Sequence, residues 1–151
     1  MGIDKDIHQN KFVDAKQKAL INLLFSYGWV IEKIKNFLAQ EDITHQQFNI
    51  LRILRGSHPK PLSTLQIRER MLDKMSDTSR IVDRLVLKEL VKKEICPADK
   101  RLVDVTITEK GQDLLKKIDA AADINGQIMQ NLSEEESEQL STLLDKMRNS
   151  I

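Results

Sequence analysis

The fold is decided by residues 76–111, which read SDTSRIVDRLVLKELVKKEICPADKRLVDVTITEKG. The first third of this stretch has apolar residues three and four positions apart, which is the spacing of a helix with one buried face. These residues are Ile81, Val82, Leu85 and Val86. Ser76 is a residue type that favours helix N-caps, so the sequence predicts a helix from Asp77 to about Lys88.

Directly after this helix the period changes. Leu90–Ile95 and Leu102–Ile107 are short, rich in β-branched residues and partly alternating, which predicts two strands. The polar segment Cys96–Arg101 separates them and has a proline near its start. The pattern is typical of a β-hairpin, and a hairpin in this place is expected to form a wing.

Two shorter helices are predicted upstream. Thr44–Gln47 has the form of a capping box and opens a helix that Gly56 is expected to end. Ser63 is expected to cap a helix from Thr64 to about Leu72. Together with the helix after Ser76, this last helix predicts a helix-turn-helix.

Long helices are predicted on both sides. One runs from about Lys5 to Ala39, with Gly28 as the place of a bend or break, and another runs from Thr108 to about Asn131. Ser133 opens a final helix with a second capping box. The apolar stripe of the first helix is too wide for one small core to cover, so a partner subunit is expected. The predicted fold class is mostly α (α+β), a winged helix-turn-helix with long terminal helices.

The composition is that of a globular protein and excludes several classes. The 151 residues contain 24 Lys and Arg, 23 Asp and Glu, and one cysteine. No apolar run reaches the roughly 20 residues of a membrane span, and no secretory signal is visible. A cytoplasmic protein is therefore expected. Residues 59–111 carry twelve basic and nine acidic side chains, whereas residues 112–151 carry four and eight, so an anionic partner would suit the middle of the chain.

From about Ile43 to Lys116 the chain resembles the MarR family of winged-helix transcription regulators. The matching motifs are Ile43-Thr44-x-x-Gln47-Phe48-x-Ile50-Leu51, Ser79-Arg80-x-Val82-Asp83-Arg84-Leu85, Leu90-Val91, Pro97-x-Asp99-Lys100-Arg101 and Val103-x-Val105-x-Ile107-Thr108-x-x-Gly111. One position departs from the family pattern, because Glu89 stands where a glycine is common. If the turn there needs a positive φ, Glu89 is strained by roughly 1–2 kcal/mol.

The resemblance implies a homodimer with interlocked terminal helices. Residues 1–42 would form an N-terminal dimerisation region, 43–110 the DNA-binding winged helix, and 111–151 the C-terminal dimerisation helices. The second helix of each helix-turn-helix would enter the major groove of double-stranded DNA, and the wing arginine would reach the minor groove.

Candidate DNA-binding residues follow from the residue types as well as from the resemblance. The expected set is Ser63, Thr64, Ser76, Thr78, Ser79, Arg80, Arg84, Lys100 and Arg101. The first turn of a recognition helix is the part that reaches base edges, and arginine can contact guanine with two hydrogen bonds. Asp99 is expected to orient Arg101. The alternative is that Arg80 and Arg84 are solvated and pair locally with Asp77 or Asp83, and that the wing tip is an ordinary charged turn.

Other features of the sequence say less about function. Cys96 is either a small semi-buried apolar residue or a site of oxidant sensing. The three histidines show no metal-ligand spacing, and neither a cofactor motif nor an enzyme active-site motif is present. Six residues would either pack the core or, as the resemblance implies, form a pocket for a small aromatic or phenolic effector. They are Tyr27, Trp29, Phe37, Phe48, Met71 and Met75.

The sequence thus predicts a homodimeric repressor that binds a pseudo-palindromic operator and is released by a small-molecule effector. The alternative is a winged-helix dimer that acts as a protein-interaction scaffold, a reading favoured by the near-neutral net charge of +1.

Overall fold

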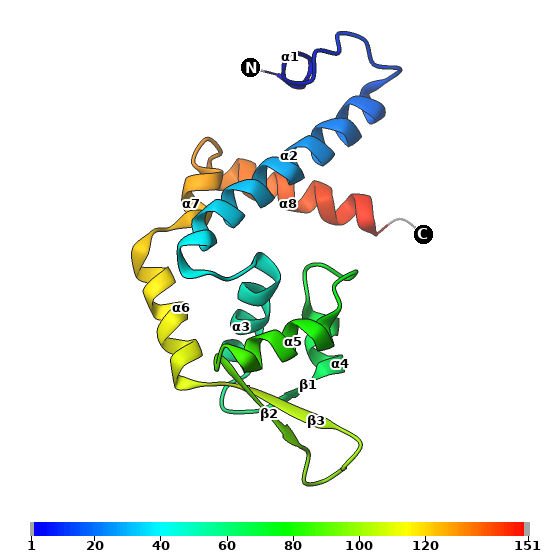
Figure 1. Ribbon diagram of the computed structural model, residues 1–151. Helices are drawn as coiled ribbons and strands as arrows, with labels where there is room; N and C mark the ends of the chain where they lie inside the picture. Colours follow the sequence, from blue (N-terminus) through cyan, green and yellow to red (C-terminus); the bar gives the residue numbers. More distant parts are fainter. Residues whose placement is uncertain (1, 150–151) are drawn as a thin grey trace. The chain divides into compact units, whose positions relative to one another are not determined.

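The computed structural model describes residues 2–149, which divide into two compact units (Figure 1). The winged-helix unit comprises Leu38–Asp123. The terminal unit comprises the described residues up to Phe37 and from Ile124 on. The predicted fold class is confirmed, because the described chain is mostly helical and has one small antiparallel sheet.

The winged-helix unit contains all the strands of the described chain and most of its short helices. Its elements are η1 (Ala39–Glu41), α3 (His45–Ser57), β1 (Leu62–Ser63), α4 (Thr64–Arg70), α5 (Thr78–Leu87), β2 (Val91–Ile95), β3 (Val103–Ile107) and α6 (Glu109–Ala121). Helices α4 and α5 form the predicted helix-turn-helix, and β2 and β3 form the predicted hairpin (Figure 1).

The predicted capping boxes at the starts of α3 and α4 are confirmed. The Thr44 hydroxyl accepts from the main-chain N–H of Gln47, whose side chain accepts from the N–H of Thr44. Ser63 and Gln66 repeat the arrangement. The predicted end of α3 at Gly56 is wrong. The helix continues to Ser57 without a left-handed cap, since glycine is tolerated within a helix at a modest cost.

Helix α5 begins one residue later than predicted. Its N-cap is Asp77, whose carboxylate accepts from the main-chain N–H of Arg80, and not Ser76. Aspartate and serine cap equally well, so the sequence alone does not choose between adjacent positions.

Helix α5 ends in a Schellman motif. The N–H of Leu90 donates to the carbonyl of Leu85, and the N–H of Glu89 donates to the carbonyl of Val86. This motif requires a left-handed residue, and Glu89 has a φ of 61°. The turn at the position that departs from the family pattern therefore does need a positive φ.

The sheet has the order β1–β3–β2, and both pairs are antiparallel. In the hairpin Val91 pairs with Ile107 and Ile95 pairs with Val103. Strand β1 was not predicted, because two residues show no alternation and the strand exists only through its pairing with β3.

The core of the winged-helix unit is aliphatic. Its fully buried side chains come from α3, α4, α5, the sheet and α6, and they include Ile50, Leu51, Leu54, Leu62, Ile67, Val82, Leu85, Val105 and Leu115. Val82 and Leu85 bury the inner face of α5, which leaves the opposite face to solvent.

The terminal unit contains α1 (Ile3–Asp6), α2 (Ala15–Leu38), α7 (Ile124–Met129) and α8 (Glu134–Arg148), and the last residue of α2 already belongs to the winged-helix unit. The prediction of one helix from Lys5 to Ala39 is wrong at its start. The carboxylate of Asp14 accepts from the N–H of Gln17 and begins α2 there, and α2 passes through Gly28 without a break.

The predicted helix from Thr108 to Asn131 is also wrong, because it is interrupted. Thr108 caps α6 as expected, but the backbone of Ala122 is extended and α7 begins after Asp123. Aspartate favours N-caps, so Asp123 suits a new helix start. The capping box of Ser133 and Glu136 at the start of α8 is confirmed.

Apolar side chains remain exposed along the long helices of the terminal unit. The most exposed on α2 are Leu20, Leu24, Phe25, Tyr27 and Trp29, and on α8 they are Leu140, Leu143 and Met147. Between residues 2 and 149, no helix is long and apolar enough to cross a membrane.

Candidate nucleic-acid interface

Helix α5 presents a polar face with two arginines. Ser79, Arg80 and Arg84 are exposed, whereas Val82 and Leu85 hold the helix on the core. Arg80 and Arg84 are four residues apart, so they lie on the same side of the helix. The arrangement leaves both guanidinium groups available at the surface.

Thr78 does not belong to this exposed face. Its residue is only 4% exposed, and its hydroxyl is buried without a hydrogen-bond partner within residues 2–149. The Ser76 hydroxyl is buried and unpartnered in the same way. Less of Thr78 reaches the surface than of its neighbours on α5, and its role as a DNA contact stays a prediction.

The predicted local pairing of the arginines is only partly present. Arg80 Nε lies 3.7 Å from Asp77 Oδ2, and both side chains are well exposed. Such surface pairs contribute little and break easily. Asp83 instead pairs with Lys93 of β2 at 2.8 Å, and in the described chain Arg84 has no ion pair. The Asp83–Lys93 pair joins α5 to the hairpin.

A surface cleft of about 490 Å³ lies between α4 and the start of α5. It is lined by Thr64 and Arg68 from α4 and by Ser76, Asp77 and Ser79 from the next segment, among others. The structure brings four predicted site residues together here: Thr64, Ser76, Thr78 and Ser79. Ser63 is the N-cap of α4, so its hydroxyl is engaged with the N–H of Gln66.

Arg68 is a basic residue of this cleft that the sequence reasoning missed. It is exposed and has no ion pair within the described residues. The signal was available, because Arg68 follows Thr64 by four residues and so shares its helix face.

The wing arginine is held by a bidentate ion pair. Arg101 Nε lies 3.1 Å from Asp99 Oδ1, Arg101 Nη2 lies 3.1 Å from Oδ2, and the Arg101 main-chain N–H also donates to Oδ1 at 3.0 Å. The guanidinium and then the N–H of Arg101 lower the pKa of the Asp99 carboxyl, and the same pair raises the pKa of Arg101. The arrangement agrees with the orienting role expected of Asp99.

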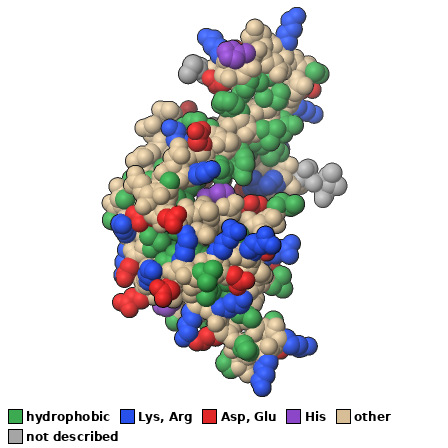
Figure 2. Space-filling model, in the orientation of Figure 1, with side chains coloured by type: hydrophobic (Ala, Val, Ile, Leu, Met, Phe, Trp, Pro, Cys, Tyr) green, Lys and Arg blue, Asp and Glu red, His purple; other side chains and the backbone are tan. Residues whose placement is uncertain are grey.

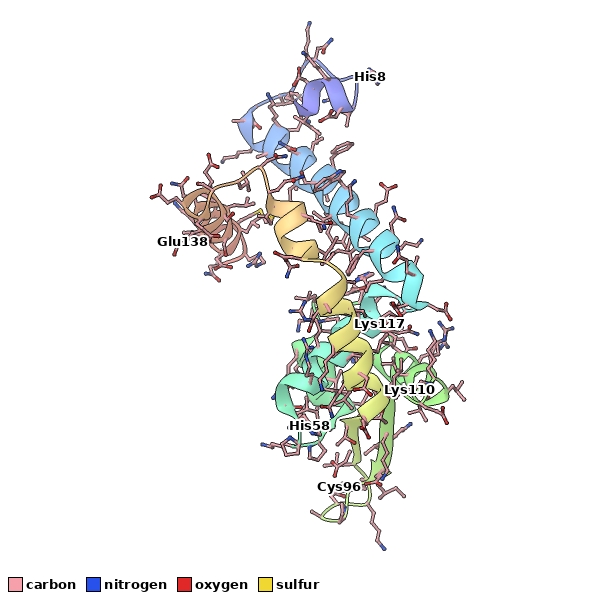
Figure 3. The ribbon with its side chains drawn as sticks, turned by 90° about the vertical axis from the view of Figure 1, so that its left-hand side faces the viewer. His8, His58, Cys96, Lys110, Lys117 and Glu138 are labelled. Carbon is pink, nitrogen blue, oxygen red and sulfur yellow. The ribbon has the colours of Figure 1, made fainter. Side chains whose placement is uncertain are left out.

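The rest of the wing tip is basic and exposed. Lys100 is exposed and has no ion pair among residues 2–149. Figure 2 shows Lys and Arg side chains projecting from the wing end of the winged-helix unit, with acidic side chains interspersed nearer its middle. Cys96 is half-buried at the far end of the hairpin (Figure 3).

The six residues predicted as an effector pocket are divided between the two units. Tyr27, Trp29 and Phe37 lie in the terminal unit, and Phe48, Met71 and Met75 lie in the winged-helix unit. Met71 is 2% exposed and belongs to the core, whereas Met75 is 93% exposed. Met71 therefore has the packing role that was the alternative, and the pocket stays a prediction.

Metal-binding side chains do not gather in the described part of the chain. No group of three His, Cys, Asp or Glu residues there could hold a metal ion. His8 lies in the terminal unit and His58 at the end of α3 (Figure 3).

Comparison with known proteins agrees with this geometry. The model of the MarR family matches residues 43–103. The chain is 30% identical over 132 residues to the HTH-type transcriptional regulator MhqR of Bacillus subtilis, covering 86% of this chain and 89% of the relative.

Two solved structures share the fold. A mutant MarR from E. coli complexed with operator DNA has a TM-score of 0.75 and 23% identity, over 97% of this chain and 99% of that one. BpsR of Bordetella bronchiseptica, whose DNA binding is regulated by 6-hydroxynicotinic acid, has a TM-score of 0.73 and 23% identity, over 84% and 96%.

The fold and the basic surface on α5 and the wing define a winged-helix protein of the DNA-binding type. The chain belongs to the MarR family of transcription regulators, whose members are not enzymes. The alternative of a protein-interaction scaffold is not favoured by these relatives.

Proposed function

We propose that this protein is a homodimeric repressor that binds a pseudo-palindromic operator in double-stranded DNA. One observation carries the proposal. Arg80 and Arg84 stand on the exposed face of α5, while Arg101 is held at the wing tip by Asp99, so one unit offers cations to two neighbouring grooves.

The roles of the residues follow from their positions. Arg80 and Ser79, in the first turn of α5, contact base edges in the major groove, and Arg84 contacts a base or a phosphate one turn later. Thr64 and Arg68 contact phosphate from α4, and Lys100 does so from the wing. Arg101 enters the minor groove, where a narrow A·T-rich segment has the strongest negative potential.

Dimerisation is proposed through the terminal unit. Large apolar side chains exposed along α2 and α8 are costly in water and suit an interface with a second copy. Basic residues near the start of α2 and the acidic first turn of α8 add charges of opposite sign to this unit. A symmetric dimer would present two α5 helices to half-sites about one helical turn apart.

Release by a small aromatic or phenolic effector is part of the proposal. Its support is that the structurally similar BpsR is regulated by 6-hydroxynicotinic acid. The candidate residues remain Tyr27, Trp29, Phe37 and Phe48, with Met75 at the surface of the winged-helix unit.

A repressor of this kind would act in the cytoplasm, where the DNA is. No cofactor is proposed.

The test is selection of duplexes from a randomised library, followed by fluorescence anisotropy at several salt concentrations. The expected result is one enriched pseudo-palindrome, bound about a thousandfold or more tighter than unrelated DNA. Affinity should fall steeply with salt, because phosphate contacts release counterions. Arg101→Glu should abolish binding while the dimer persists in sedimentation. A library that yields no enriched sequence at low salt would contradict the proposal.

A further inference from the structure

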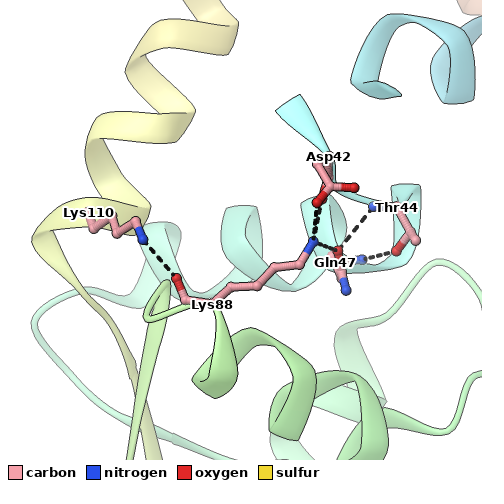
Figure 4. A network of polar contacts seen from close by, with 5 residues as sticks. All are labelled: Asp42, Thr44, Gln47, Lys88 and Lys110. Atoms are coloured by element: carbon pink, nitrogen blue, oxygen red, sulfur yellow. Dashed lines mark hydrogen bonds and ion pairs between the residues drawn. The ribbon is translucent and has the colours of Figure 1, made fainter. Parts of the chain in front are cut away.

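The C-terminal end of α5 is fastened to a distant turn by one lysine (Figure 4). Lys88 is the C-cap residue of α5, and its ammonium donates to the main-chain carbonyl of Asp42. The same ammonium lies 3.4 Å from Gln47 Oε1 and 3.8 Å from Asp42 Oδ2. A single cation thus joins the recognition helix to a segment more than forty residues earlier in the chain.

The acceptors of this ammonium are themselves fixed. Asp42 is left-handed, with a φ of 52°, and its N–H donates to the carbonyl of Ala39, so its carbonyl points in a set direction. Gln47 is 5% exposed, and its Oε1 also accepts from the N–H of Thr44 in the capping box of α3. The lysine therefore binds to a rigid turn rather than to a mobile side chain.

The main chain at the end of α5 is also held by two hydrogen bonds from the start of α6 and the residue before it. Lys110 Nζ donates to the Lys88 carbonyl at 3.1 Å, and the Thr108 hydroxyl donates to the Glu89 carbonyl at 2.8 Å. Figure 4 shows Lys88 spanning from this contact to Asp42. The end of α5 is thereby held between the start of α6 and the turn that follows η1.

The Asp42 turn lies at the start of the winged-helix unit. The winged-helix unit begins at Leu38, the last residue of α2, so residues 39–44 are the first segment of that unit after the long helix. A displacement of this segment would act on α5 through the ammonium, because the acceptor is main chain. The contact acts at the C-terminal end of α5, after Val82 and Leu85, the buried residues that hold the helix on the core.

We propose that Lys88 is a positioning residue for DNA recognition, which sets the orientation of α5 by tying its end to the Asp42 turn. This proposal rests on the proposed DNA-binding function. The Lys88 side chain is two-thirds covered and its ammonium is engaged with Asp42 and Gln47, so we expect it to act through α5 and not through a phosphate contact.

The experiment compares Lys88→Met with Lys117→Met. Both variants remove one ammonium and keep much of the aliphatic chain. Both lysines line the same surface cleft, but Lys117 pairs with Glu41 at 3.1 Å and has no bond to α5. Lys88→Arg keeps a cation with several donors and serves as the rescue variant.

Anisotropy is measured on the selected operator and on an unrelated duplex over a range of salt. Lys88→Met is expected to weaken operator binding about tenfold while affinity for unrelated DNA and the salt slope stay unchanged. Lys88→Arg should recover most of the loss, and Lys117→Met should behave as wild type. An equal loss on both duplexes with a salt slope lower by about one would show a phosphate contact and overturn the proposal. Unchanged operator binding would also overturn it.

Amide hydrogen exchange without DNA separates this proposal from the proposed function. Lys88→Met should speed exchange at the amides of Lys88, Glu89 and Leu90, which close α5, and at Asp42, while Lys117→Met leaves the α5 amides unchanged. If wild type selects no operator, the DNA-binding proposal fails and exchange still decides whether the tether exists. If exchange at the end of α5 is identical in Lys88→Met and wild type, the positioning role is overturned.

Discussion

A side chain on Gly111 would collide with the backbone of Leu90: a Cβ there would lie 2.3 Å from the Leu90 carbonyl oxygen and 2.7 Å from Ile107 Cγ1. The first turn of α6 thus packs directly on the backbone of Leu90, the residue between α5 and β2. This close approach explains the glycine three residues after Thr108, since Gly111 is helical and needs no positive φ.

Gly111→Ala is therefore expected to lower the free energy of unfolding by about 1–3 kcal/mol, because backbone must shift to admit the methyl group. Denaturant unfolding followed by circular dichroism measures the change. Gly56→Ala is the matched control, since a Cβ there meets nothing within 4 Å and the residue lies inside α3. That variant should gain up to about 1 kcal/mol. Equal stability of the two variants would contradict the packing argument.

Glu89→Gly is expected to stabilise the winged-helix unit by about 1 kcal/mol, because a residue with a φ of 61° is strained unless it is glycine. The gain is reduced by the loss of the ion pair with Lys110, at 3.6 Å, which is exposed and weak. Glu89→Gln removes the same charge and keeps the strain. Thermal unfolding should rank Glu89→Gly above wild type and Glu89→Gln at or slightly below it. A Glu89→Gly variant less stable than Glu89→Gln would refute the strain.

Asp99→Asn is expected to weaken operator binding several-fold, because the neutral amide no longer holds Arg101 with two charge-assisted hydrogen bonds. Anisotropy on the selected operator measures the loss. Glu94→Gln is the control, since the Glu94 carboxylate pairs with Lys92 on β2, at 2.6 Å, and not with Arg101 or Lys100. The orienting role fails if Asp99→Asn tightens binding, as simple removal of a negative charge near DNA would do.

The Asp99 carboxyl should titrate below its ordinary pKa of 3.8, because the Arg101 guanidinium and N–H stabilise the carboxylate. A group whose pKa is lowered in the folded state contributes stability above its unfolded pKa and loses it as pH falls through the folded value. The wing-tip pair is therefore intact at neutral pH and lost only in acid below about pH 4. NMR titration of the carboxyl carbon measures the shift. Arg101→Gln should move the pKa of Asp99 upward, and an unchanged value would show that the pair does not form in solution.

Arg80→Ala and Lys100→Ala should have different effects on DNA binding. Arg80 is proposed to contact base edges, so its loss should cost about 1–3 kcal/mol of binding free energy and relax selection at one operator position. Lys100 is proposed to contact phosphate, so its loss should weaken binding to all duplexes alike and lower the salt slope by about one. Repeating the library selection with each variant tests this. The same outcome for both variants would contradict the assigned positions.

The sequence by itself determined the elements whose signals are local. The capping boxes at Thr44, Ser63 and Ser133 each operate within three residues, and the apolar period of α5 and the β-branched runs of the hairpin need no distant partner. The family motifs supplied the order of helices and wing, and with it the exposed arginines. Errors fell at helix ends, where Ser76 and Asp77 are equally good caps, and at the interruption after Ala121.

Only the tertiary structure decided which of these residues meet. It buried Thr78, formed β1 by pairing Leu62 with Val105, and brought the ammonium of Lys88 to the carbonyl of Asp42. The partners in these contacts are more than forty residues apart in the sequence, so local periodicity cannot predict them. Packing of the aliphatic core brings them together. Caps and periodicity fix what a segment becomes, whereas burial and long-range hydrogen bonds fix where its side chains point.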